Sequence, residues 1–503
     1  MSVTNSAPDT IPEPPKPDGS RNRVIALLAG AALFCVMLAV PPPEGLSQAG
    51  WRVAAVALVM ALWWLTEALP VAATALLPIV LLPLLGIEPI KKVTANYANP
   101  LIFLFMGGFM LAMALQRWNL HRRIALRVLK AFGTRPTMLV AGFMLATAGL
   151  SMWISNTATT VMMVPIAVSV LALLNDDKVA HMVAGDERNF HVALMLGIAY
   201  AASIGGVGTL IGTPPNALLA AYMANAHGRA IGFAQWMAFG LPIVAIMLPA
   251  AWWLLVRVAY PLQRAAIPGA AGVISDELRA MGRMSAPERR VGLVFLAAAL
   301  LWVFRSPLRA LLPDLPLSDA GIAVAAALLL FALPAGVPKD DDRAGQRLMD
   351  WETALRLPWG VLILFGGGLA LAGAIQASGL AGWIGGALKG GDAWPLILAV
   401  GAVAALIVFL TEITSNTATT AVFLPVVAAV APAGMDPLLL TATVALSASC
   451  AFMMPVATPP NAIVFGTGHV TIPQMARAGL LLNLFIIVLI SVAVTTLVPV
   501  IFG

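Results

Sequence analysis

The same six residues occur twice in this sequence, and this repetition limits the possible folds more than any other feature. Residues 155–160 and residues 415–420 both read Ser-Asn-Thr-Ala-Thr-Thr, an offset of 260 positions. The same offset relates three further pairs: Phe105 and Phe365, Gln116 and Gln376, and Pro165 and Pro425. A register kept without a gap over about sixty residues predicts two structurally equivalent halves.

A second motif also occurs once in each half. Residues 213–217 and residues 458–462 both read Thr-Pro-Pro-Asn-Ala, at an offset of 245 positions. A polar stretch, residues 259–287, separates the halves and runs into the sequence Ser285-Ala-Pro-Glu288, a capping box that predicts the start of a helix. We therefore interpret residues 259–287 as a connector between two repeats.

The composition excludes a set of water-soluble domains. Of 503 residues, 60% are hydrophobic and 10% are charged, against roughly 25% charged in ordinary soluble proteins. Such a chain is predicted to be an all-α polytopic membrane protein, and its 37 prolines and 43 glycines suit broken helices that are buried in protein. The net charge of +6 requires no nucleic acid, because the excess lies in short loops.

Eleven apolar runs are each long enough to cross a hydrocarbon core of about 30 Å at about 1.5 Å per residue. The first covers residues 24–40 and follows a Pro-rich segment, residues 1–22, that we expect to be a disordered cytoplasmic tail. The others lie near residues 51–69, 71–86, 100–116, 191–222, 234–258, 288–305, 317–336, 358–377, 437–465 and 475–501.

The distribution of basic residues predicts that the two repeats are inverted in the membrane. Residues 117–135 contain six basic residues, whereas the equivalent residues 377–395 contain only Lys389. Basic loops stay on the cytoplasmic side, so the two equivalent segments should lie on opposite sides. The connector is also basic and belongs inside, which places the N-terminus in the cytoplasm and the C-terminus outside.

Two almost uncharged stretches, centred on the Ser-Asn-Thr motifs, are not predicted to be simple membrane spans. Residues 136–175 and residues 393–435 each predict two helical arms that meet at a polar tip, although Glu412 lies beside the second tip. One interpretation is a hairpin whose turn lies in water; the other is a re-entrant hairpin with a buried tip. Six identical residues at both tips favour the re-entrant hairpin, because a turn in water tolerates many polar residues.

The Thr-Pro-Pro-Asn motifs predict two unwound helices. Each proline removes a backbone donor and frees the carbonyl four residues earlier. A simple proline kink is the alternative, but recurrence at corresponding places in both halves favours a functional break. At membrane depth, such a break must be buried in protein or face water.

Tips and breaks together offer a specific chemistry. Carbonyl, hydroxyl and amide oxygens are hard ligands for a small cation such as Na⁺. Helix N-termini at the tips and after the breaks present free N–H groups and a positive dipole end to an anion. The sequence has no Lys or Arg near either tip, so bound cations should help to hold the anion, and transport should be coupled to ions.

These paired motifs, with Trp63-Trp64-Leu65-Thr66-Glu67, resemble the divalent anion/sodium symporter family, whose members carry dicarboxylates, citrate or sulfate. The resemblance covers residues 24–503. It implies a homodimer of eleven-helix protomers with two re-entrant hairpins, in which a transport domain moves past a scaffold as an elevator. It also implies a multi-pass protein of the plasma membrane, the inner membrane in bacteria, in contact with lipid.

The resemblance also implies site residues and cofactors, with two Na⁺ sites and a third ion left open. The first sodium site would consist of Ser151, Ser155, Asn156 and Gly212, and the second of Thr411, Thr414, Asn416 and Ala457. The substrate carboxylates would meet Asn156, Thr157, Thr213, Asn416, Thr417, Thr458 and Pro459. Residues 24–132 and 288–390 would be scaffold, and residues 136–258 and 393–503 would form the two transport units.

The expected function is uptake of a divalent anion, a C4-dicarboxylate such as succinate, malate or fumarate, driven by Na⁺. A Na⁺-independent dicarboxylate exchanger on the same fold is the alternative, and an anion channel is a more remote one. No catalytic residue is predicted, because the apolar segments contain no Ser/His pair, Asp dyad or His-Glu-x-x-His cluster. Two interpretations of Glu412 stay open: it tunes the second cation site, or it is a buried hydrogen-bond partner.

Overall fold

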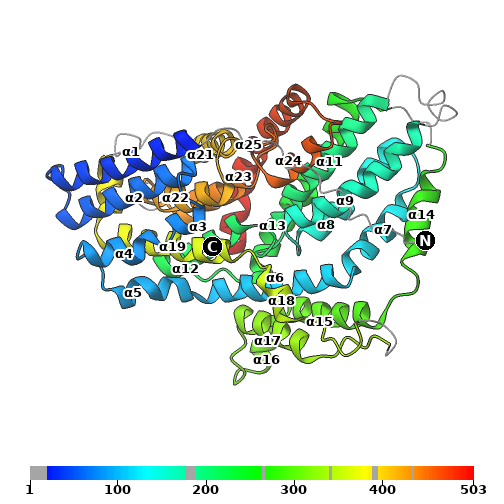
Figure 1. Cartoon of the computed structure of the whole chain (residues 1–503). Coiled ribbons are helices and arrows are strands. Elements are labelled where there is room, and N and C mark those ends of the chain that lie inside the picture. The colour runs from blue at the N-terminus through cyan, green and yellow to red at the C-terminus, as the bar shows by residue number, and fades with distance from the viewer. Residues whose placement is uncertain (1–19, 176–186, 263–266, 339–342, 388–394, 432–434) are drawn as a thin grey trace, which may run out of the picture.

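The chain forms an all-helical structure, as the composition predicts. The computed structural model describes residues 20–175, 187–262, 267–338, 343–387, 395–431 and 435–503. Within these ranges the backbone forms helices and no strand, and one isolated bridge joins Pro334 to Arg347 (Figure 1). Residues 1–19 of the expected disordered tail lie outside the described residues. Residues 20–22 of that tail already belong to the first helix.

Among the residues that the structure describes, seven helical segments are long and apolar enough to cross a membrane, and an eighth is reached if a bent pair counts as one span. The seven are α1 (Ser20–Ala39), α2 (Gln48–Thr66), α5 (Ile90–Ala95) continued by η1 (Asn96–Ala98) and α6 (Pro100–Arg117), α11 (Glu187–Gly206), α13 (Phe233–Trp253) with η3 (Leu254–Ala259), α19 (Trp359–Ala377) and α25 (Ile472–Phe502). The pair, α15 (Ala286–Val303) and α16 (Arg305–Leu311), bends by 70°. The chain is therefore polytopic, while the count of eleven stays a prediction.

Three of the runs predicted as spans are broken into shorter helices. They become α3 (Val71–Thr74) with α4 (Leu77–Leu84), α11 with α12 (Pro214–His227), and α23 (Pro437–Ala448) with α24 (Pro459–Gly466). A proline occupies one of the first two positions of α4, α12 and α24, where its missing N–H does no harm. The last two breaks lie at the Thr-Pro-Pro-Asn motifs, where unwinding was predicted.

Both stretches around the Ser-Asn-Thr motifs fold into helical hairpins. The first consists of α8 (Pro136–Ser151) and α9 (Asn156–Leu171), and the second of α21 (Leu396–Thr411) and α22 (Asn416–Ala429). At about 1.5 Å per residue, the longest of these four α-helices is about 24 Å, and the 3-10 helix η2 (Ala172–Asn175) directly continues α9. At each tip a serine caps the returning helix: Ser155 accepts from Ala158 N, and Ser415 accepts from Ala418 N.

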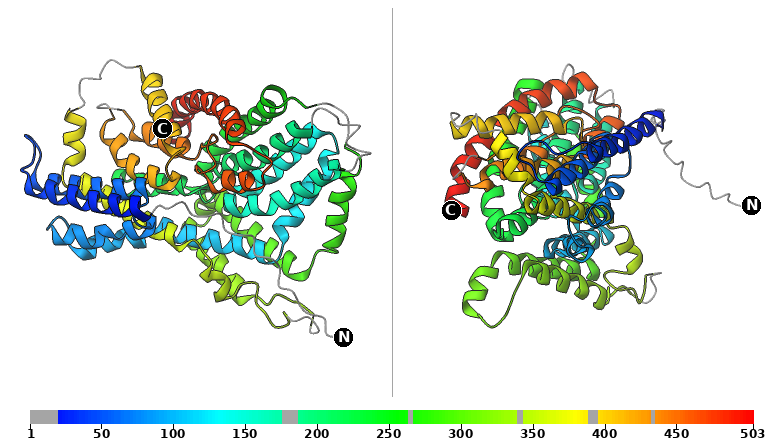
Figure 2. Two further views of the ribbon diagram at one scale, coloured as in Figure 1. Left: turned by 45° about the horizontal axis from the view of Figure 1, so that its top comes forward. Right: turned by 90° about the vertical axis from the view of Figure 1, so that its left-hand side faces the viewer.

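The two repeats interlock around these hairpins. The arm α9 packs against α11 of its own repeat and against α24 of the other repeat, and α22 packs in the same way against α23 and α12. Each hairpin therefore contacts one half-helix from each repeat. In Figures 1 and 2 the orange and red helices of the second repeat accordingly lie beside the cyan and green helices of the first.

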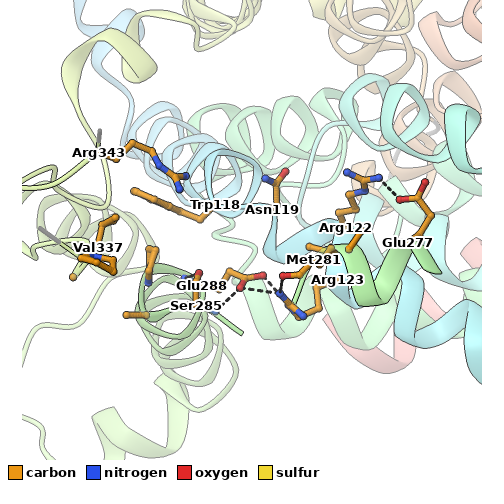
Figure 3. A pocket seen from close by; sticks show the side chains of 15 residues that line it. Trp118, Asn119, Arg122, Arg123, Glu277, Met281, Ser285, Glu288, Val337 and Arg343 are labelled. Atoms are coloured by element: carbon orange, nitrogen blue, oxygen red, sulfur yellow. Dashed lines mark hydrogen bonds and ion pairs between the residues drawn. The ribbon is translucent and has the colours of Figure 1, made fainter. Parts of the chain in front are cut away.

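The two basic segments that were assigned to the same membrane side lie against each other. Arg123 of α7 (Leu120–Phe132) forms a buried ion pair with Glu288 of α15, with an Nε–Oε1 distance of 2.8 Å. Its guanidinium also donates to the carbonyl oxygen of Met281, just beyond the connector helix α14 (Ala270–Ala280) (Figure 3), and to that of Gly282. The capping box predicted at Ser285 and Glu288 is confirmed.

Candidate functional site

The tips of both hairpins and the breaks of both unwound helices line one cavity of about 1070 Å³. The cavity takes Ser155, Asn156 and Thr157 from the first tip and the equivalent residues 415–417 from the second. All seven residues predicted to meet the substrate line it: Asn156, Thr157, Thr213, Asn416, Thr417, Thr458 and Pro459. Segments that lie more than two hundred residues apart in the chain thus share one polar space.

Six of the eight predicted sodium ligands line the same cavity: Ser155, Asn156, Gly212, Thr414, Asn416 and Ala457. The other two, Ser151 and Thr411, are the last residues of α8 and α21 and are fully buried. The Ser151 hydroxyl donates to Asn156 Oδ1 at 2.6 Å, and the Thr411 hydroxyl donates to Asn416 Oδ1 at 2.7 Å. Each repeat therefore joins a buried hydroxyl to the tip asparagine in the same geometry.

The hairpin tips are the better donors toward an anion. The first N–H groups of α9 and α22 have no acceptor within their helices, and both helices begin at the cavity. The helices that follow the breaks were expected to contribute N–H groups as well. That expectation is wrong for their first two positions, because α12 and α24 both begin with two prolines, which have no N–H.

Glycine lets the first break lie against the first hairpin. A Cβ added to Gly205 would overlap the carbonyl oxygen of Ala148 in α8, and a Cβ on Gly212 would overlap the carbonyl oxygen of Gly206. A Cβ on Gly206 would lie 2.9 Å from Asn156 Oδ1. The break is thus in direct contact with the tip asparagine, and only glycine allows this approach.

The cavity wall also contains three charged residues that the sequence analysis did not place there. Arg23, Glu67 and Arg356 all line it and are exposed. Glu67 closes α2 in the left-handed region, with φ of 47°, which is unusual for a residue other than glycine. Its place in the Trp-Trp-Leu-Thr-Glu motif was a usable signal, whereas nothing in the local sequence distinguishes the two arginines.

These charged residues show where the cavity opens. Arg23 lies at the start of α1, Glu67 follows α2, Gln116 lies at the end of α6, and Arg356 follows α18 (Trp351–Leu355). The basic segment 117–135 begins directly after Gln116. The cavity therefore opens at the end of the helix bundle that the charge distribution assigns to the cytoplasm.

Glu412, beside the second tip, is a buried hydrogen-bond acceptor. Glu412 is 4% exposed, and its carboxylate accepts from the backbone N–H groups of Phe452, Met453 and Met454, at 2.7 to 3.0 Å. The Asn483 side chain of α25 donates to it as well, at 2.7 Å. These contacts match the structural interpretation of Glu412, because four donors satisfy the carboxylate without a cation.

The chain matches a family model and curated relatives over nearly its whole length. Residues 21–502 match the family described as the sodium:sulfate symporter transmembrane region. The sodium-dependent dicarboxylate transporter SdcS of Staphylococcus saprophyticus is 43% identical over 483 residues, which cover 96% of this chain and 92% of SdcS. SdcS of Staphylococcus aureus is also 43% identical, over 486 residues that cover 96% and 93%.

Two solved structures share the fold at low sequence identity. The Alcanivorax borkumensis YdaH transporter superimposes with a TM-score of 0.56 at 15% identity, covering 95% of this chain and 98% of YdaH. Neisseria gonorrhoeae MtrF, from a class of antimetabolite efflux pumps, superimposes with a TM-score of 0.55 at 13% identity, covering 95% of each chain. These likenesses concern architecture alone. The family match and the SdcS identity go further, and the chain therefore belongs to the divalent anion/sodium symporter family, as its paired motifs predict.

Proposed function

We propose that this protein couples the inward movement of Na⁺ to the uptake of a C4-dicarboxylate such as succinate, malate or fumarate. The observation that carries the proposal is the convergence of two tips and two breaks on one cavity. Relatives with 43% identity that are named sodium-dependent dicarboxylate transporters support the choice of ion and substrate class.

In this proposal the two ends of the dicarboxylate are held by equivalent groups of the two repeats. One carboxylate meets Asn156 and Thr157 at the N-terminus of α9, and the other meets Asn416 and Thr417 at the N-terminus of α22. Two Na⁺ ions, one in each repeat, bind the hydroxyl, amide and carbonyl oxygens below the tips. The sodium ions neutralise the substrate in a site whose tips contribute no Lys or Arg.

The electrical work favours more than one sodium ion. Moving two negative charges into a cell at about −100 mV costs about 4.6 kcal/mol, at about 2.3 kcal/mol per charge. Two Na⁺ ions cancel this charge, and their concentration gradient then drives uptake. A third ion would make uptake electrogenic, so a membrane potential applied to proteoliposomes separates the two stoichiometries.

The remaining architecture belongs to the same proposal. Residues 24–132 and 288–390 form the scaffold of a homodimer in the plasma membrane, and residues 136–258 and 393–503 form an elevator-type transport unit with two re-entrant hairpins. The interlocked packing of α9 with α24 and of α22 with α12 supports one moving body built from both repeats. The N-terminus is cytoplasmic and the C-terminus external.

Purified protein in liposomes tests the function directly. We expect an inward Na⁺ gradient to drive accumulation of labelled succinate, with citrate and sulfate as weaker competitors. Uptake without Na⁺ that requires internal dicarboxylate would instead establish an exchanger. A steady anion current at fixed voltage, independent of any coupling ion, would establish a channel.

A further inference from the structure

The asparagine of each Thr-Pro-Pro-Asn motif makes the same two contacts in both repeats. Asn216 Nδ2 donates to the carbonyl oxygens of Gly206, at 3.0 Å, and Thr209, at 2.8 Å. Asn461 Nδ2 donates to the equivalent carbonyl oxygens of Ala451, at 3.1 Å, and Met454, at 3.0 Å. Both asparagines have no exposed surface, so these are contacts of the protein interior.

These contacts close the breaks in the two unwound helices. Gly206 ends α11, and its carbonyl has lost the N–H that a continuing helix would supply. Asn216 lies in the first turn of α12 and returns a donor to that carbonyl across the break. One amide group therefore joins the end of one half-helix, the loop and the start of the next half-helix.

The first closed break lies against the groups proposed to bind the first sodium ion. A Cβ on Gly206 would lie 2.9 Å from Asn156 Oδ1 and 3.2 Å from the carbonyl oxygen of Gly212. The carbonyl oxygen of Gly206 also accepts a hydrogen bond from the Asn216 side chain. Asn216 thus holds Gly206, which lies against the proposed ligands Asn156 and Gly212. The Asn216 side chain itself donates only to backbone carbonyl oxygens.

The second repeat has a corresponding connection. The Thr411 hydroxyl lies within hydrogen-bonding distance of two acceptors, Asn416 Oδ1 at 2.7 Å and the carbonyl oxygen of Ala448 at 3.1 Å. Ala448 is the last residue of α23, three positions before the carbonyl that Asn461 holds. Tip and break are therefore joined near the second cation site as well.

The side-chain oxygen of each asparagine makes no hydrogen bond, unlike the side-chain nitrogen. Among the residues that the structure describes, Asn216 Oδ1 and Asn461 Oδ1 are buried and have no hydrogen-bond partner. A buried acceptor without a partner is unfavourable, so an apolar residue would suit packing alone better. Asparagine at both positions is explained by the two hydrogen bonds that its nitrogen donates.

We propose that Asn216 and Asn461 are positioning residues, each of which shapes the carbonyl ligands of the cation site in its own repeat. Asn216 acts on the Gly212 side of the first site, and Asn461 acts on the Ala457 side of the second. This inference rests on the proposed function, because it assumes that Na⁺ binds at both sites. It assigns to these asparagines no contact with the ion or the substrate.

The test uses Asn216→Leu and Asn461→Leu, which keep the branching and approximate size of the side chain, remove its donors and add no charge. We expect Na⁺ alone, titrated into purified full-length protein with choline as the balancing cation, to raise the melting temperature. In each variant the Na⁺ concentration at half effect should rise about tenfold or more, the range seen when groups that orient metal ligands are lost. Asn189→Leu is the matched control, because Asn189 donates to the Pro261 carbonyl oxygen away from the breaks, and its titration should match the wild type.

Double variants distinguish positioning from general stability. Asn216→Leu should be non-additive in Na⁺ affinity with Ser151→Ala of the same repeat and additive with Thr411→Ala of the other repeat. If the leucine variants do not fold, Asn216→Ala and Asn461→Ala, which also lack a side-chain donor, give the same comparison. Wild-type Na⁺ titrations in the variants, or equal coupling within and across repeats, would overturn the inference alone. Absence of any Na⁺ response in the wild type would overturn the proposed function and this inference with it.

Discussion

The two repeats build equivalent sites by different means. In both, a buried hydroxyl bonds the tip asparagine and a second asparagine closes the break. In the first repeat, glycine brings the break onto α8, and the Thr209 hydroxyl donates to the carbonyl oxygen of Met152 at the tip. In the second repeat, Glu412 stands in place of Met152 and holds three consecutive N–H groups of the break.

This difference shows that the geometry at the tips and breaks is shared by the two repeats, whereas the contacts that support it are not. The positions equivalent to Gly205, Gly206 and Gly212 are Cys450, Ala451 and Ala457, so the second break carries side chains where the first has only glycine. Its N–H groups point to a carboxylate, whereas in the first break Gly208 N donates to the carbonyl oxygen of Gly205 within the loop. Close backbone contact and a buried acid are thus alternative supports for the same arrangement.

The largest expected effect tests whether the two sites are equally necessary. Asn156→Ala and Asn416→Ala should each reduce Na⁺-driven succinate uptake at least about 100-fold, because each removes a predicted ligand of both sodium and substrate. Uptake in proteoliposomes and size-exclusion profiles of the purified variants provide the measurement and the folding control. Near-normal uptake in either variant would show that its repeat does not contribute to the site.

The second prediction compares the two repeats at the position where the first break lies against its hairpin. Gly205→Ala should lower stability by about 1–3 kcal/mol, because the added methyl group overlaps the Ala148 carbonyl oxygen. Cys450→Ala, at the equivalent position, should change stability less, since it causes no overlap and removes one buried sulfur atom with its weak hydrogen bond to the Leu446 carbonyl oxygen. Melting curves in detergent measure both, and equal shifts would contradict the claimed difference in packing.

A third prediction concerns the acid that only the second repeat has. Glu412→Gln should lower the melting temperature, because hydrogen bonds to a charged group contribute about 1.5–3 kcal/mol each and the amide replaces one acceptor with a donor. Met152→Leu, at the equivalent position, is the control and should leave it unchanged. A Glu412→Gln protein of normal stability but altered Na⁺ titration would instead favour cation tuning.

The smallest expected effect lies at the mouth of the cavity, to which each half contributes one arginine. Arg23→Gln and Arg356→Gln should each raise the KM for succinate about two- to threefold on the side where the cavity opens, because exposed charges steer anions weakly in salt. Raising the ionic strength should remove the difference from the wild type. Arg127→Gln, at an exposed position outside the cavity, is the control, and an equal change there would indicate a general effect of charge.

Much of the site was predictable because its residues repeat. The two copies of Ser-Asn-Thr and of Thr-Pro-Pro-Asn identified the hairpin tips and the helix breaks that line the cavity. Proline and N-cap chemistry act within a few residues, so the helix starts at Asn156 and Pro214 follow from local sequence. Arg23 and Arg356 were not predictable in this way, because they reach the cavity only through the packing of α1 and α18.

The sequence by itself determined the class of fold, the positions of the tips and breaks, and the family, since these depend on composition and on short-range backbone chemistry. Only the tertiary structure decided which helices pack against the tips and breaks. The packing of α9 on α24 and of α22 on α12, the four donors on Glu412, and the amide bridges of Asn216 and Asn461 all join segments through contacts in space. Such contacts depend on where helices cross, and no periodicity along the chain records that.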